Sequence, residues 1–315
     1  MSGTDSTAIP DPSSEPQGSG SPRPVTALPS AARLAYWSLR RELWENRWVY
    51  IVPLIVAGLV LLGFAFGLIK AHFSLKTGAP LRLPQAWIGE AFNFASGVLM
   101  LTYLVIAAIY CLGALHGERS DRSILFWKSL PVSDVTTVIV KAGMPIIVLP
   151  AITFALIVVT QAVMSLAAIV VLLGKGVDMA AMWAQMSLLA MWAAMFYHLF
   201  TVHALYYAPF YGWLLLASGW ARRAVFLWAG LPVVAILIIE KLVFDSAAFA
   251  HMLLSRLEGG PAAIAFPPHG GMPMQAPTLG NVAAFLASPG LWIGFAVCAV
   301  FLAAAVRLRR YQGPI

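Results

Sequence analysis

Charged side chains are scarce in this sequence, because Lys, Arg, Asp and Glu together make up only 10% of its 315 residues. A soluble domain carries about 25% charged residues and about 45–50% apolar ones. Here 60% of the residues are hydrophobic and the mean hydropathy is +0.82. The composition excludes a water-soluble enzyme and indicates a protein that crosses a membrane several times. Since the apolar runs are long and unbroken, they fit helices and not the short alternating strands of a transmembrane barrel.

Cysteine is equally rare, with Cys111 and Cys298 as the two examples, and each lies within an apolar run. A thiol in such a position usually behaves as a small buried hydrophobic group. We therefore expect no disulfide framework and no metal site built from cysteines.

Motifs for ATP hydrolysis and for intramembrane hydrolysis are missing from the sequence. The string closest to a phosphate-binding loop, Gly174-Lys175-Gly176, lacks the upstream glycine and the hydroxyl residue that such a loop needs. His-Glu-x-x-His and Gly-x-Ser-x-Gly do not occur, so zinc proteolysis and serine hydrolysis lack their catalytic residues. We expect neither enzymatic activity nor a resident cofactor or metal in this chain.

Six apolar runs are long enough to cross a bilayer, since one crossing needs about 20 apolar residues. The third and fourth exceed that length, which predicts tilt, a kink or an extension beyond the bilayer. Proline removes a backbone donor and crowds the preceding turn, so Pro145, Pro150 and Pro209 are the expected kink points. The predicted spans are Trp48–Ile69, Phe92–Leu115, Val138–Leu173, Met186–Ala217, Ala224–Val243 and Leu291–Val306.

The distribution of positive charge predicts the orientation of these spans. Membrane proteins retain Lys and Arg on their cytoplasmic loops, and most of the 20 Lys and Arg residues fall on one side if both termini are cytoplasmic. We therefore predict an N-in, C-in topology. The net charge of +7 follows from the same bias and gives no reason to expect nucleic acid as a partner.

The segments outside the spans have distinct compositions. Residues 1–30 are rich in Ser, Pro and Gly, which predicts a disordered cytoplasmic tail, and residues 31–315 form one transmembrane domain. Ala31–Arg47 is amphipathic and fits a helix lying on the membrane surface or a water-exposed extension of the first span. Residues 245–290 form a long outer insertion, in which we expect short interfacial helices.

Polar side chains within the fourth span offer one candidate solute pathway. His198 and His203 lie within this span, and His203, Tyr207 and Tyr211 recur every four residues, so these three share one helix face. That face fits a polar cavity or, equally, a seam in which these side chains hydrogen-bond to neighbouring helices. Glu240 lies near the outer interface, where we expect it to be solvated or paired with Lys241.

The most informative segment is the first cytoplasmic loop, residues 116–134, which reads HGERSDRSILFWKSLPVSD. Four charges of both signs precede four large apolar residues, and a Ser133-Asp134 helix start follows. Aromatic and Arg side chains dominate the energetics of protein interfaces, so the loop predicts a short helix that docks on a partner protein. A helix resting on lipid headgroups, with Trp127 as its anchor, fits the same pattern.

The sequence from Glu118 to Ser133 resembles the loop after the second span in bacterial permeases of the type-2 ABC exporter family. The similarity extends over nearly everything from Ala31 onward, although the Pro/Gly/Met-rich stretch Pro261–Pro277 departs from the family pattern. Supporting features are the amphipathic segment before the first span, Tyr211-Gly212-Trp213 leading to Trp220-Ala221-Arg222-Arg223, the outer insertion, and the ending Arg307-Leu308-Arg309-Arg310-Tyr311.

The resemblance implies a six-span subunit in the bacterial cytoplasmic (inner) membrane that pairs with a second permease, as a homodimer or a heterodimer. Export would be driven by alternating access, with ATP and magnesium used by separate ATPase subunits. The family's ATPase-coupling residues would correspond to Glu118, Arg119, Asp121, Arg122, Phe126, Trp127 and Lys128. From the residues alone, two other classes stay open: a secondary carrier using His198, His203 or Glu240, and a membrane enzyme or scaffold whose loop recruits a cytosolic protein.

Overall fold

The computed structural model describes residues 30–77, 84–129, 132–173, 187–260, 277–313 and 315. These residues form helices and connecting turns without a strand, and six helical segments among them are long and apolar enough to cross a membrane. The prediction of an all-helical, multi-pass membrane protein is therefore confirmed. The predicted tail, apart from Ser30, and residues 261–276 of the departing stretch lie outside the described residues.

The helices follow the predicted spans, and several run beyond the predicted bounds: the first ends at Thr77 instead of Ile69. The second span begins at Pro84 instead of Phe92, and the last runs to Tyr311 instead of Val306. The elements are α1 (Ala31–Glu45), α2 (Trp48–Thr77), α3 (Pro84–Ala114), α4 (His116–Ser120), α5 (Ser123–Ser129), α6 (Asp134–Gly143), the π-helical η1 (Met144–Val148), α7 (Leu149–Leu172), α9 (Leu188–His198), the π-helical η2 (Leu199–Tyr206), α10 (Ala208–Trp220), α11 (Val225–Phe244), α12 (Ala248–Leu257), α13 (Leu279–Ala287) and α14 (Pro289–Tyr311).

Short polar side chains fix the starts of the helices that lie next to loops. Ser30 accepts a hydrogen bond from the backbone N–H of Arg33, at the start of α1. Ser133 does the same for Thr136 in α6, which confirms the helix start predicted at Ser133-Asp134. These bonds satisfy backbone donors that have no partner within the first turn of a helix.

The prolines predicted as kink points lie at two departures from α-helical geometry. Pro145 is within η1, Pro150 is in the first turn of α7, and Pro209 follows η2. A proline cannot donate the backbone hydrogen bond of a regular helix, and wide π turns are a recognised way of accommodating such an interruption. The long third and fourth helical stretches are thus interrupted near their proline residues.

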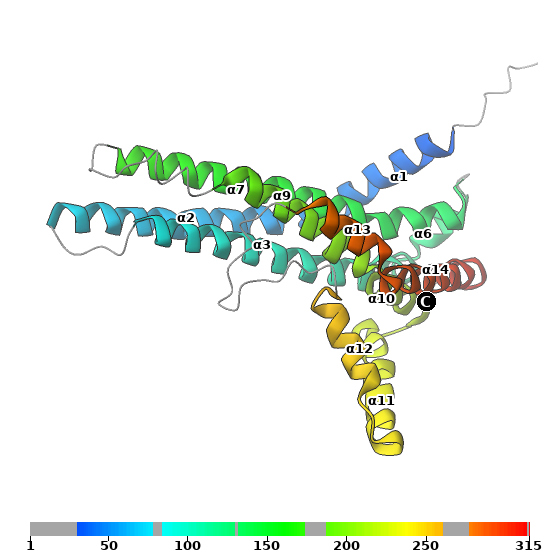
Figure 1. The fold of residues 1–315 in the computed structure, drawn as a ribbon. Coiled ribbons are helices and arrows are strands. Elements are labelled where there is room, and N and C mark those ends of the chain that lie inside the picture. Colours follow the sequence, from blue (N-terminus) through cyan, green and yellow to red (C-terminus); the bar gives the residue numbers. More distant parts are fainter. Residues whose placement is uncertain (1–29, 78–83, 130–131, 174–186, 261–276, 314) are drawn as a thin grey trace, which may run out of the picture.

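Helices α2, α3 and α7 run side by side as the long part of the bundle (Figure 1). Helix α10 packs against α14, and a Cβ added at Gly212 would lie 3.2 Å from the sulfur of Cys298. Glycine at this position therefore lets the two helices approach closely. Cys111 and Cys298 are both buried free thiols.

Helices α11 and α12 project away from the long part of the bundle (Figure 1). Helix α12 belongs to the segment 245–290 that was predicted as an outer insertion, and its Arg256 guanidinium lies 4.5 Å from the ring centroid of Tyr206. The same guanidinium donates a 2.8 Å hydrogen bond to the carbonyl oxygen of Gly290. The insertion is therefore attached to the interior of the protein at the end of η2.

Candidate partner-docking surface

The loop after the second span forms two short helices, α4 and α5, where the sequence predicted one. The break is at Asp121-Arg122, where Arg122 adopts a left-handed backbone conformation with φ of 62°. The side chain of Asp121 accepts a 3.0 Å hydrogen bond from the backbone N–H of Ser123. A non-glycine residue with positive φ is uncommon, so the turn has to be held in place by the residues on either side of it.

Helix α4 is held in place by a group of buried charged side chains, which we call the ion-pair cluster. Glu118 lies at its centre, 3.1 Å from Lys141 of α6 and in direct contact with Arg309 of α14. Lys141 also donates a 2.7 Å hydrogen bond to Glu42 of α1. The cluster comprises Arg41, Glu42, Glu118, Asp134, Lys141 and Arg309.

The cluster joins four parts of the chain that are far apart in sequence: α1, α4, α6 and α14. Three of these, α1, α6 and α14, are seen at the same end of the bundle in Figure 1. Asp134 completes the chain of contacts, because its Oδ1 lies 3.0 Å from Nε of Arg309. A buried charge is tolerated when it is paired and hydrogen-bonded, so these side chains fix the relative positions of the four helices.

Glu42 shows how the surroundings stabilise the charged form of a buried acid. Its side chain is 1% exposed, and it accepts a 2.9 Å hydrogen bond from the hydroxyl of Tyr110. Burial raises the pKa of Glu42, but the charge of Lys141 and the hydrogen bonds from Lys141 and Tyr110 outweigh burial and lower the pKa below 4.5.

Arg119 fastens α4 to the end of α10. Its guanidinium donates hydrogen bonds to the carbonyl oxygens of Gly219 and Ala221 at 2.5 and 3.4 Å. The last carbonyls of a helix have no partner within that helix, and Arg119 supplies one. The hydroxyl of Ser218 accepts bonds from the N–H groups of Leu115 and His116 at the start of α4.

Two side chains of α5, Trp127 and Lys128, contact neighbouring parts of the chain on one side of the helix. The guanidinium carbon of Arg41 lies 3.7 Å from the ring centroid of Trp127, which is close for a cation–π contact. The ammonium of Lys128 donates to the carbonyl oxygens of Arg310 and Gln312 at 3.4 and 3.3 Å. The end of α14 and α1 therefore flank this helix.

The opposite side of the loop is exposed. Leu125 and Phe126 are each 59% exposed, and Asp121 and Arg122 are exposed beside them. Ile124 points inward and is 1% exposed. The predicted coupling set thus divides into two: an outward face of Asp121, Arg122 and Phe126, and a supporting set of Glu118, Arg119, Trp127 and Lys128.

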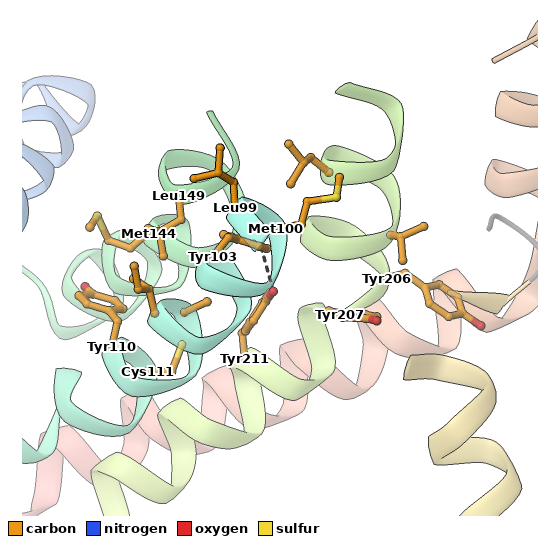
Figure 2. Packing of buried hydrophobic residues seen from close by; sticks show 14 of the residues in the cluster. Leu99, Met100, Tyr103, Tyr110, Cys111, Met144, Leu149, Tyr206, Tyr207 and Tyr211 are labelled. Carbon is orange, nitrogen blue, oxygen red and sulfur yellow. Dashed lines mark hydrogen bonds between the residues drawn. The ribbon is translucent and has the colours of Figure 1, made fainter. Parts of the chain in front are cut away.

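The pathway residues predicted in the fourth span do come together, in a buried group around η2. The ring centroids of His198 and His203 are 4.8 Å apart, and those of His203 and Tyr207 are 5.3 Å apart. The Tyr211 hydroxyl donates a 2.7 Å hydrogen bond to the carbonyl oxygen of His203. Figure 2 shows Tyr211 pointing toward Tyr103 of α3, which the sequence analysis did not single out.

Glu240 is not paired with Lys241. Its carboxylate accepts a 3.0 Å hydrogen bond from the backbone N–H of Phe249 and a 3.1 Å bond from the hydroxyl of Ser246. Lys241 pairs with Asp245 at 2.6 Å. Of the two expected alternatives, the pairing with Lys241 was wrong, because the chain turns after α11 and brings the start of α12 to Glu240, whose side chain stays partly exposed.

The partners of Glu118 in the ion-pair cluster, Lys141 and Arg309, were not predicted as site residues, although the sequence holds a signal for Lys141. Lys141 falls inside the third predicted span, and an ionisable residue within a span usually has a specific partner.

Among the described residues, no group of three or more His, Cys, Asp or Glu side chains is arranged to hold a metal ion. No protein-family model matches the chain, and no curated protein matches it.

Proposed function

We propose that this chain is the membrane subunit of a bacterial ATP-binding cassette exporter in the cytoplasmic membrane. In this proposal it works as a dimer with a second permease and with separate ATPase subunits, which bind ATP and magnesium. The six apolar helices support a transport role. The observation that carries the proposal is the exposed face of Asp121, Arg122, Leu125 and Phe126 on a base fixed by buried ion pairs.

The ion-pair cluster supports a mechanism in which force on α5 reaches several spans at once. Glu118 contacts Lys141 of α6 and Arg309 of α14, while α4 follows directly on α3. A movement of the loop would therefore displace the cytoplasmic ends of three spans together. We propose that closure of the ATPase pair drives this movement and opens the cavity between the two permeases outward.

The proposed topology places both termini and the loop on the cytoplasmic side. It is supported by the meeting of α1, the loop and the end of α14 at one end of the bundle (Figure 1). Helix α1 would lie on the membrane surface there. The proposed dimer is supported by α11, because only 11% of the residues in its most apolar stretch are buried within the chain.

The test is a double substitution of the exposed apolar pair, Leu125→Ala with Phe126→Ala. Interface anchors of this kind contribute about 2 kcal/mol or more, so co-purification with the proposed ATPase subunit should fall by at least about 30-fold. ATP-driven solute movement into membrane vesicles should fall with it. The matched control is Leu166→Ala with Val170→Ala, which alters two exposed apolar residues of α7, away from the loop and from α11.

Unchanged co-purification and unchanged ATP-driven transport in the loop variant would contradict the proposal. Transport that needs no ATPase and stops when the proton gradient collapses would instead favour the secondary carrier. Trp127 is less suitable for this test because its loss also removes the contact with Arg41. Phe126 also contacts Trp127, with ring centroids 4.9 Å apart, so the single variant Leu125→Ala is measured beside the double variant to separate docking from support.

A further inference from the structure

A groove of about 710 Å³ lies between α2 and α3, far from the loop, with Met164 of α7 at its base. Ligand pockets usually measure about 300–1,000 Å³, so the groove has the size of a small-molecule site. On α3 it is lined by residues three or four positions apart, from Trp87 to Val98. At about 1.5 Å per residue, this face is roughly 16 Å long.

Two glycines of α2, one turn apart, shape the groove in different ways. A Cβ on Gly67 would lie 2.2 Å from the ring of Trp87, so this glycine lets the indole pack against the helix. Trp87 also stacks on Phe64 with ring centroids 5.1 Å apart. A Cβ on Gly63 would meet no atom within 4 Å. The end wall at Trp87 is therefore firmly packed, whereas the groove beside Gly63 is open.

Glu90 is the one charged residue that lines the groove, and every other lining residue is apolar. It is exposed, and no ion pair joins it to another side chain among the residues that the structure describes. It lies within the second membrane span. Glu90 is in the first turn of that span and lines an otherwise apolar groove, so charge complementarity makes an external cation its natural partner.

We infer that this groove binds an amphipathic organic cation with a single apolar body. Its ammonium group pairs with Glu90, and its apolar chain lies between α2 and α3 toward Val98 and Val56. The carboxylate disfavours neutral and anionic amphiphiles. The volume favours a single-chain molecule over a two-chain phospholipid. The inference depends on insertion in a membrane and not on the proposed ATPase, so either can fail without the other.

The experiment uses the full chain in nanodiscs made of phosphatidylcholine and phosphatidylglycerol. The probe is a dodecylammonium ion that carries a photoreactive diazirine at the end of its chain, and labelled peptides are mapped by mass spectrometry. We expect labelling on the groove-lining parts of α2 and α3. Unlabelled dodecylammonium should compete with the probe for labelling of these peptides.

Two substitutions test the two halves of the site. Glu90→Gln removes the charge at nearly constant shape and should weaken labelling at least tenfold, since a charge-assisted contact is lost. Gly63→Leu places a side chain in the open part of the groove and should abolish labelling. Asp245→Asn is the control for loss of a carboxylate. Gly58→Leu is the control for Gly63→Leu, because a Cβ at Gly58 also meets no atom within 4 Å and Gly58 does not line the groove.

Elution as a single species in size-exclusion chromatography shows that each variant is folded. Equal competition by dodecanol or dodecanoate would overturn the inference, because the carboxylate would then select nothing. Displacement of the probe by phosphatidylethanolamine at the same concentrations would also overturn it in favour of a lipid site. Labelling that is unchanged in Glu90→Gln and Gly63→Leu would show that the probe binds elsewhere.

Discussion

The ammonium of Lys141 lies 2.7 Å from the carboxylate of Glu42, and both side chains are almost fully buried. Lys141 is shared between Glu42 and Glu118, whose carboxylate is 3.1 Å away on the other side. Arg41 also lies 3.1 Å from Glu42 and 3.7 Å from Glu118. The pairing brings α1, which precedes the first span, against α6 at the start of the third. This contact connects the N-terminal helix to the base of the proposed docking surface.

Replacing Lys141 with Met should therefore destabilise the protein strongly. Removal of one partner from a buried pair leaves an uncompensated charge and typically costs about 3–5 kcal/mol. We expect a clear fall in the melting temperature of the protein in detergent. Lys241→Met is the matched control, because Lys241 is 68% exposed in its pair with Asp245 and a surface pair contributes only about 0–1 kcal/mol. Equal shifts in the two variants would contradict the assigned role.

Glu42 should make stability fall on the acid side. Its pKa in the folded protein is below its ordinary value of 4.5, so the unfolded chain binds a proton first as the pH falls. The stabilisation is complete above about pH 4.5 and is lost as the pH falls through the lower, folded-state pKa. Unfolding measured from about pH 6 to pH 3 should show this loss, and Glu42→Gln should reduce it.

Glu45 provides the contrast for this pH test. Burial raises the pKa of Glu45, and Arg41 offsets this only in part. A raised pKa means that the folded protein is stabilised less once Glu45 ionises, so Glu45→Gln should leave the acid-side loss intact. If Glu45→Gln abolished the loss and Glu42→Gln did not, the assignment to Glu42 would be refuted.

The contact between Arg41 and Trp127 should hold α5 in its position beside α1. A cation–π contact is worth about 0.5–2 kcal/mol, so Trp127→Leu should speed hydrogen exchange of the α5 amides by roughly 2- to 30-fold. Trp37→Leu is the control, since Trp37 lies under Arg40 at a longer distance of 5.2 Å and is 50% exposed. Exchange in α5 that does not change in Trp127→Leu would show that the contact contributes nothing.

Most of the fold could be predicted from the sequence, because long apolar runs and short polar caps act locally. The six membrane-crossing segments and the start of α6 at Ser133-Asp134 were found in this way. The break at Asp121-Arg122 could not be found. It depends on a left-handed residue between two short helices, and nothing in the local pattern requires that conformation of an arginine.

The candidate docking surface was predictable as a segment but not as a surface. The sequence places Glu118, Arg122 and Trp127 in one loop, and all three look equally suited to contact a partner. Glu118 is held inward by Lys141 and Arg309, and Trp127 is held by Arg41, all of which lie in other helices. Pairing between residues so far apart along the chain leaves no local pattern, although the presence of Lys141 inside an apolar span was a signal.

The hydroxyl of Tyr103 should hold the two π-helical segments together. It lies 2.8 Å from the carbonyl oxygen of Pro145 in η1 and 3.0 Å from that of His203 in η2, and it also bonds to Tyr211 (Figure 2). Leaving a buried polar group unsatisfied costs about 1–3 kcal/mol, so Tyr103→Phe should lower the free energy of unfolding by that amount.

Tyr36→Phe is the matched control for this substitution, because Tyr36 is 59% exposed and loses no buried bond. Hydrogen exchange should also rise in both η1 and η2 of the Tyr103→Phe variant, since one hydroxyl bridges the two segments. An increase confined to η1 would mean that Tyr103 supports its neighbour without coupling the two. In that case the long third and fourth helical stretches would respond separately to a force applied at the loop.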